Sequence, residues 1–136
     1  MIKLIVGLKG TGKTKHLIEL ANRSVETSPG NVVCIEKGSK LIFDIRHQVR
    51  LVDTDEYSIK SAGELYGLVC GILSANFDIK DMYIDSALKI CQDKMDEYRD
   101  FVLRANALAA KFEVNIVMTS SVSVDDIPED LKKFII

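Results

Sequence analysis

The chain has 136 residues, the length of one ordinary domain, and a hydrophobic fraction of 47%, which is enough to bury a core. Charged residues make up 28%, but the formal net charge is only −2, so composition offers no overall attraction for nucleic acid or for an anionic membrane. No apolar run approaches the ~18 residues of a membrane span, the N-terminal run is too short for a signal peptide, and the 3 cysteines form no CxxC pair. We therefore expect a single domain over residues 1–136 that is cytoplasmic, with cysteines as small core residues.

Strand-like and helix-like patterns alternate along the first third of the chain. Ile2 to Val6 is a short apolar run that ends in glycine, and it predicts a buried strand. Lys13 to Arg23 has the apolar spacing of a helix, and a turn follows at Pro29 to Asn31. Val32 to Glu36 predicts a second strand. Leu41 to Ile45 fits either a short helix or a hairpin strand, because a run of this length shows no clear period.

The same alternation continues to the end of the chain. It predicts, in order, a strand at Val49 to Asp53, a helix at Ser58 to Ser74, a strand at Met82 to Asp85, a helix at Asp96 to Phe112 and a strand at Val114 to Thr119.

Asp126 is expected to cap a last helix, with Pro128 in its first turn. Apolar strands that alternate with helices indicate an α/β fold whose sheet is covered on both faces. We therefore predict a three-layer sandwich with a mainly parallel sheet of about five strands. By analogy with other open α/β sheets, a ligand would bind at the carboxyl ends of the strands.

The segment from Gly7 to Thr14 matches the phosphate-binding pattern G-x-x-x-x-G-K-[ST] between a predicted strand and a predicted helix. Glycines let backbone amides curl around phosphate oxygens, and the helix N-terminus adds its dipole. In this pattern Lys13 reaches the β- and γ-phosphates, and the Thr14 hydroxyl ligates Mg²⁺. The residues expected to bind nucleotide here are Gly7, Lys9, Gly10, Thr11, Gly12, Lys13 and Thr14.

On this segment the chain resembles the P-loop NTPase superfamily. The additional Gly10 gives G-x-x-G-x-G-K-T, which looks like the branch of RecA-like and motor ATPases, with thymidine kinases near it. The resemblance implies the P-loop NTPase fold, a Walker A loop, and ATP with Mg²⁺ as ligands.

The apolar strand that ends in Asp85 looks like the Walker B strand of such proteins, in which the acid holds Mg²⁺. Asp53 ends another apolar run and is the competing candidate. Its alternative role is to cap the turn before the next helix. We expect Thr14 and Asp85 to hold the metal, and Lys13 and Asp85 to act in catalysis.

Many RecA-like and motor ATPases carry a glutamate directly after the Walker B aspartate as the base that activates water. Here that position is Ser86, which predicts slow hydrolysis by the isolated protein. Glu36, at the end of another strand, is the substitute candidate for the base, and its alternative role is an exposed strand-end charge. Thr119 ends a further strand where related ATPases sense the γ-phosphate, although strand ends often carry ordinary hydroxyls.

Several motifs of related families are missing. The chain has no N-K-x-D sequence to read guanine, so ATP is the expected nucleotide. It has no CxxC zinc lasso, and Arg99 and Arg104 have the spacing of a solvated helix face and not of a kinase lid.

The leading hypothesis for the function is a slow Mg-dependent ATPase that acts as a switch or assembly subunit. The alternatives are a minimal P-loop small-molecule kinase and a module that uses nucleotide only structurally.

Two further features bear on partners. The basic segment Lys37 to Arg50 could supply Arg46 or Arg50 as an arginine finger to a neighbouring site, contact a phosphate backbone, or form a solvated surface. Gly63, Gly67 and Gly71 lie on one face of a predicted helix, where they fit close packing on the protein's own sheet or contact with another subunit. We expect nucleotide as ligand and a homo-oligomer or protein partner that completes the site, and neither a membrane nor nucleic acid as partner.

Overall fold

The computed structural model describes residues 1–136 and has a five-stranded sheet at its centre. The strand order is β1-β5-β4-β2-β3, and every neighbouring pair is parallel. This confirms the predicted parallel sheet. The strands are β1 (Ile2–Gly7), β2 (Asn31–Glu36), β3 (Arg50–Asp53), β4 (Ile79–Ile84) and β5 (Asn115–Ser121).

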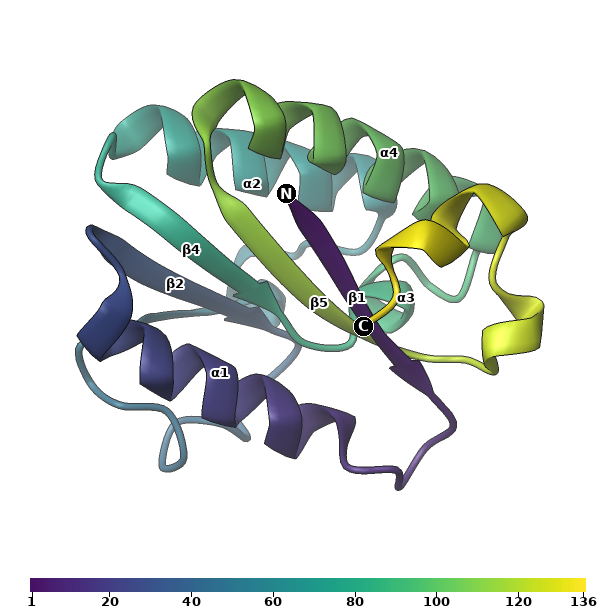
Figure 1. Ribbon diagram of the computed structural model, residues 1–136, viewed down its shortest axis with the longest axis horizontal. Coiled ribbons are helices and arrows are strands. Elements are labelled where there is room, and N and C mark those ends of the chain that lie inside the picture. The colour runs from purple at the N-terminus through teal and green to yellow at the C-terminus, as the bar shows by residue number, and fades with distance from the viewer.

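Helices cover both faces of this sheet, which confirms the three-layer α/β arrangement (Figure 1). Helix α1 (Lys13–Thr27) lies on one face, and α2 (Ala62–Ala75) lies beside α4 (Met95–Phe112) on the other. A short helix, α3 (Ala87–Ile90), follows β4. No helix is both long enough and apolar enough to cross a membrane.

Alternate residues of each strand contribute to two separate cores, because successive side chains of a strand point to opposite faces of the sheet. In β4, Met82 and Ile84 pack in the core under α2 and α4, while Tyr83 packs in the core under α1. Both faces of the strand are therefore apolar, which is why the sequence shows a continuous apolar run there. Cys34 and Cys91 are buried and Cys70 is half-buried, as the core interpretation of the cysteines predicts.

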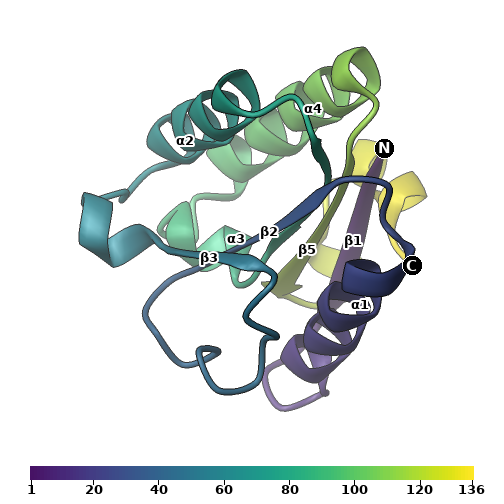
Figure 2. The ribbon, with the colours of Figure 1, turned by 90° about the vertical axis from the view of Figure 1, so that its left-hand side faces the viewer.

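The loop of residues 37–49 connects β2 to β3 and takes the place of a crossover helix on the α1 face (Figure 2). Leu41 and Ile45 are buried there, but the segment between them forms neither of the two predicted structures. It makes a single turn, in which the amides of Asp44 and Ile45 donate to the Leu41 carbonyl. The Asn22 side chain then holds the Asp44 carbonyl and the Arg46 amide, at 2.9 Å and 2.8 Å, so side-chain bonds replace further backbone turns.

The predicted last helix at Asp126 is wrong. The chain forms two 3₁₀ turns instead, η2 (Val124–Asp126) and η3 (Glu129–Phe134), and Ser123 is the residue that caps the first. Pro128 explains the break, because proline disfavours helical backbone in the residue before it, and Ile127 is extended. The end of the chain runs along the edge strand β1, where the Ile136 amide donates to the Leu4 carbonyl at 3.0 Å.

Helix α2 begins at Ala62, four residues later than Ser58, the predicted start. The structural reason is a cap: the Ser61 hydroxyl accepts from the Glu64 amide at 3.1 Å, and the Glu64 carboxylate accepts from the Lys60 amide at 2.8 Å. The residues before it form a short 3₁₀ helix, η1 (Thr54–Tyr57).

The three glycines of α2 do not pack on the sheet. Gly63, Gly67 and Gly71 are exposed, and a Cβ atom built on each would meet no atom within 4 Å. The interpretation as close packing against the protein's own sheet is therefore wrong. The helix faces its own core with other residues, namely Ala62, Leu65, Val69 and Leu73.

Candidate functional site

The loop between β1 and α1 has the backbone that its glycines were expected to provide. Gly10 and Gly12 have φ angles of 86° and 83°, a region that residues with side chains rarely adopt. A Cβ atom on Gly7 would lie 2.8 Å from the Thr11 hydroxyl, so a side chain at this position would require the Thr11 side chain to move.

Two side chains of this loop converge on one carbonyl. The Thr11 hydroxyl and the Lys13 ammonium both donate to the Leu8 carbonyl oxygen, at 2.8 Å and 2.9 Å. Helix α1 starts directly after Gly12 with no side-chain cap and no acidic residue in its first turn. The amides and the positive dipole end of the first turn therefore remain for an anion.

Asp85 lies directly after β4 and receives hydrogen bonds from two distant elements. Its Oδ1 accepts from the Thr14 hydroxyl of α1 at 3.1 Å and from the Thr119 hydroxyl of β5 at 2.7 Å. Asp85 is 9% exposed and Thr119 is 2% exposed, so this carboxylate is held at the edge of the pocket. The strand order β1-β5-β4 creates this meeting, because it sets β5 between the loop strand and the Asp85 strand.

Ser86 adds a backbone hydrogen bond to the Asp85 and Thr119 side chains' network. Its amide donates to the Thr119 hydroxyl at 2.8 Å, and its own hydroxyl lies 3.4 Å from Asp85 Oδ2. Ser86 has a φ angle of 60°, which is uncommon for a residue with a side chain and turns the chain from β4 into α3. The Thr119 hydroxyl is thus occupied on both sides, as donor to Asp85 and as acceptor from Ser86.

Glu36 ends β2 and anchors the loop that follows it. Its carboxylate accepts from the Lys40 amide at 3.1 Å and from the Leu41 amide at 3.2 Å, and the residue is only 2% exposed. Burial raises the pKa of Glu36, the two amides lower it, and the carboxylates of Asp85 and Asp53 raise it further. Glu36 is therefore a buried loop anchor and not the exposed strand-end charge of the alternative interpretation.

Asp53, the competing metal candidate, caps the turn after β3. Its Oδ1 accepts from the amides of Asp55 and Gly38, at 2.9 Å and 2.8 Å. It does not line the pocket that contains Asp85. The capping role is the one that the structure gives it.

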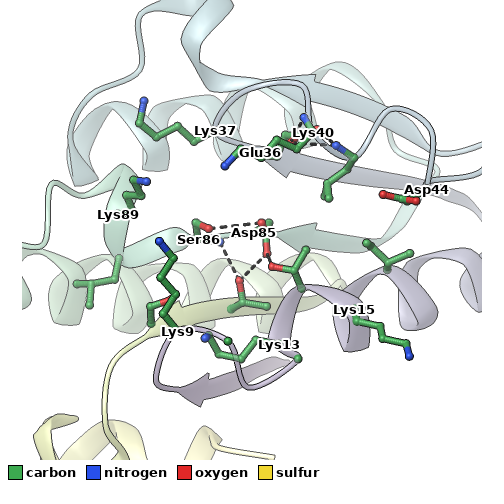
Figure 3. Close-up of a pocket in the computed structure, with 18 of the residues that line it drawn as sticks. Lys9, Lys13, Lys15, Glu36, Lys37, Lys40, Asp44, Asp85, Ser86 and Lys89 are labelled. Atoms are coloured by element: carbon green, nitrogen blue, oxygen red, sulfur yellow. Dashed lines mark hydrogen bonds between the residues drawn. The ribbon is translucent and has the colours of Figure 1, made fainter.

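The residues at the carboxyl ends of the strands line one pocket of about 530 Å³ (Figure 3). Residues of the loop between β1 and α1 and the three strand-end side chains Glu36, Asp85 and Thr119 line this pocket together. Gly7 and Thr11 belong to the loop but do not line the pocket. The predicted site residues that line it are Lys9, Gly10, Gly12, Lys13, Thr14, Glu36, Asp85 and Thr119.

The lining of the pocket carries more positive than negative side chains, and much of it was not predicted. Six lysines line it, against four acidic residues. Lys89 is on α3, a helix that the sequence does not predict because four residues are too few to show a helical period. Lys37 and Lys40 come from the basic segment after β2. The remaining lining residues include Lys15, Asp44, Asp93 and Ser121.

The arginines of the chain stay outside this pocket. Arg46 pairs with Glu26 on α1 at 3.1 Å, and both side chains are exposed. Arg99 forms a two-pronged pair with Asp130, and the Arg104 guanidinium lies 3.9 Å from the centre of the Tyr66 ring. No arginine closes over the phosphate loop.

The donors at Thr14 and Asp85 fit a magnesium ion that is shared with phosphates. Mg²⁺ in such sites takes one or two carboxylates, keeps several waters and receives its other oxygens from the substrate. A hydroxyl and a carboxylate 3.1 Å apart supply that limited set. No group of three or more His, Cys, Asp or Glu side chains is arranged to hold a metal without such help.

A comparison with protein-family models finds no match to this chain, and a comparison with curated proteins finds none either.

Proposed function

We propose that the protein is a P-loop nucleotide-binding protein that binds MgATP and hydrolyses it slowly, as a switch or assembly subunit. The observation that carries the proposal is the hydrogen bond of 3.1 Å between Thr14 and Asp85. It joins the residue that ends the phosphate-binding pattern to the acid after β4, within one cationic pocket. This combination of glycine loop, lysine, hydroxyl and acid is what a magnesium triphosphate requires.

Each residue would have a defined task in binding. The first-turn amides of α1 and the Lys13 ammonium would hold the phosphate oxygens, and Lys13 would exchange its bond to the Leu8 carbonyl for a phosphate contact. Thr14 and Asp85 would hold the metal, which supplies charge neutralisation at the phosphates when it is bound. Glu36 would keep the loop of residues 37–49 in place as the far wall of the pocket.

A thermal shift experiment tests this proposal. MgATP at 100 times its dissociation constant should stabilise the folded protein by about 2.7 kcal/mol through mass action. Lys13→Ala should remove most of this shift. Lys94→Ala is the matched control, because Lys94 is an exposed lysine outside the pocket. If ATP raises the melting temperature of the Lys13→Ala protein as much as that of the unmodified protein, the assignment of the phosphate-binding loop is wrong.

We also propose that ATP binds more tightly than GTP, because the chain contains no guanine-reading motif. Isothermal titration with each nucleotide in the presence of Mg²⁺ measures the difference. Tighter binding of GTP would overturn this part of the proposal and leave the phosphate site intact.

A small-molecule kinase is the second candidate, and one observation favours it. The pocket extends past the phosphate loop to the end of β2, where Glu36, Lys40 and Asp44 form a polar wall. A phosphoryl acceptor would bind between that wall and Asp85. Phosphate release from ATP in the absence of any acceptor favours the ATPase, whereas release that stays at the uncatalysed rate favours the kinase.

A further inference from the structure

We propose that Lys89 is the residue of this chain that contacts the terminal phosphate of a bound nucleoside triphosphate. The inference rests on the proposed function and adds to it a residue that lies outside the phosphate-binding pattern. It starts from a gap in the site: no arginine lines the pocket, so any cation opposite the phosphate loop must be a lysine.

The structure of α3 directs this lysine to the pocket. Ala87, Leu88 and Ile90 are buried, and Lys89 is the one exposed residue of the helix. Figure 3 shows Lys9 and Lys89 approaching the space beside Ser86 from two different elements. No acidic side chain pairs with Lys89, whereas Lys37, on the far wall, pairs with Asp55 at 2.8 Å.

The backbone of Lys89 is held at both ends. At the start of α3, the Ser86 amide is bound to the Thr119 hydroxyl at 2.8 Å, and the Ile90 amide donates to the Ser86 carbonyl at 3.0 Å. At its end, the Asp93 amide donates to the Leu88 carbonyl and the Gln92 amide to the Lys89 carbonyl, both at 2.9 Å. These two bonds form a Schellman motif, so the backbone that carries the Lys89 side chain is fixed in position.

The closure of α3 also carries backbone strain. Gln92 and Asp93 both have a φ angle of 58°, although neither is glycine. Such conformations cost of order 1 kcal/mol or more and persist where the surroundings impose them. At Gln92 this is the left-handed conformation that a Schellman motif has at that position, so the motif fixes the end of α3.

Lys89 follows a strand that is nearer to the phosphate-binding loop than the strand that precedes the other lysines on the opposite side of the pocket. Strands lie about 4.8 Å apart, so the end of β4 is roughly 10 Å from the phosphate loop strand and the end of β2 roughly 14 Å. Lys89 follows β4, four residues after Asp85, which would hold the metal at the outer phosphates. Lys40 follows β2, one strand farther away. Lys89 is therefore the lysine of the opposite wall that is placed for the terminal phosphate.

This contact has a consequence for hydrolysis. The oxygen of a water molecule bonds to the γ-phosphorus, the bond from that phosphorus to the bridging oxygen breaks, and ADP leaves with the electron pair. Both protons of the water end on the released phosphate: one stays on the attacking oxygen, and the other is transferred to another phosphate oxygen. Lys89 stays protonated throughout and stabilises the charge on the phosphate oxygens.

Isothermal titration of ATP and ADP with Mg²⁺ tests the assignment. Lys89→Gln should weaken ATP binding about tenfold more than ADP binding, because only ATP has the terminal phosphate, and Lys89→Arg should restore most of the difference. Lys94→Gln is the matched control, since Lys94 is exposed, is near Lys89 in the chain and does not line the pocket. It should leave both affinities unchanged.

The outcomes separate this inference from the function on which it rests. If the unmodified protein binds ATP but Lys89→Gln changes ATP and ADP affinity by the same factor, or not at all, the role of Lys89 is overturned and the P-loop function is retained. If the unmodified protein binds neither nucleotide, both proposals fail. Circular dichroism of each variant checks that the fold is intact.

Discussion

The Thr119 hydroxyl donates a 2.7 Å hydrogen bond to Asp85 Oδ1, the same oxygen that accepts from Thr14. Thr119 also accepts from the Ser86 amide, so one buried hydroxyl connects β5, the carboxylate after β4 and the start of α3. A direct γ-phosphate contact by Thr119 would require it to give up one of these bonds. The geometry favours a positioning role, in which Thr119 fixes the orientation of Asp85.

Thr119→Val should therefore weaken Mg²⁺-dependent ATP binding and also destabilise the fold. The Ser86 amide would lose its acceptor, at a cost of roughly 1–3 kcal/mol in the free energy of unfolding. Thr119→Ser keeps a hydroxyl and should restore most of both properties. Urea unfolding and ATP titration measure the two effects, and a valine variant with unchanged stability and affinity would contradict the role.

Asp85→Asn should weaken ATP binding in Mg²⁺ about tenfold or more, since an interaction with a charged partner contributes roughly 1.5–3 kcal/mol. The loss should largely disappear when affinity is measured in EDTA. Asp53→Asn is the comparison, because Asp53 caps the turn after β3 outside the pocket. The reverse order of effects would move the metal site to Asp53.

Glu36→Gln should reveal the raised pKa of Glu36 as a pH-dependent difference in stability. The folded pKa lies above the ordinary value of 4.5, so the folded state binds a proton more tightly than the unfolded state does. The stability of the unmodified protein relative to Glu36→Gln is then greatest below pH 4.5 and falls as the pH rises through the folded pKa. Unfolding of both proteins between pH 4 and pH 8 measures the difference, and a constant difference would rule out the shift.

The same variant tests the catalytic role of Glu36. If Glu36 is the general base, Glu36→Gln should keep ATP binding and lower phosphate release by about 10²-fold or more. If it is only the anchor for the Lys40 and Leu41 amides, turnover should stay close to that of the unmodified protein, and that result would remove Glu36 from the mechanism.

Alanine at Gly63, Gly67 or Gly71 should stabilise the fold by about 0.5–1 kcal/mol each, because alanine is the better helix former and nothing lies within 4 Å of the added carbon. Thermal unfolding measures the gain. Light scattering of the same variants, with and without a nonhydrolysable ATP analogue, tests the expected homo-oligomer. If another subunit packs closely on this face, alanine should stabilise the monomer and weaken the assembly. A strict monomer in every condition would leave the glycine face without a partner.

The features that the sequence by itself determined are those with a local physical signal. Alternating strand and helix periods predicted the three-layer fold, and the glycine spacing predicted the loop whose backbone Gly10 and Gly12 provide. The boundary errors have equally local causes: the cap at Ser61 starts α2, and Pro128 divides the last segment into two 3₁₀ turns.

Tertiary structure alone decided which of these parts meet. Thr14 and Asp85 are 71 positions apart and come within 3.1 Å only because β5 pairs between β1 and β4. The conformation of residues 41–45 depends on Glu36 and Asn22, and the approach of Lys89 depends on the closure of α3. Periodicity records which face of a segment is apolar, but strand order and loop conformation depend on packing and on hydrogen bonds between distant residues. For that reason the glycine pattern of the sequence predicted the loop of residues 7–14, and only the folded chain placed the opposite wall of the pocket beside it.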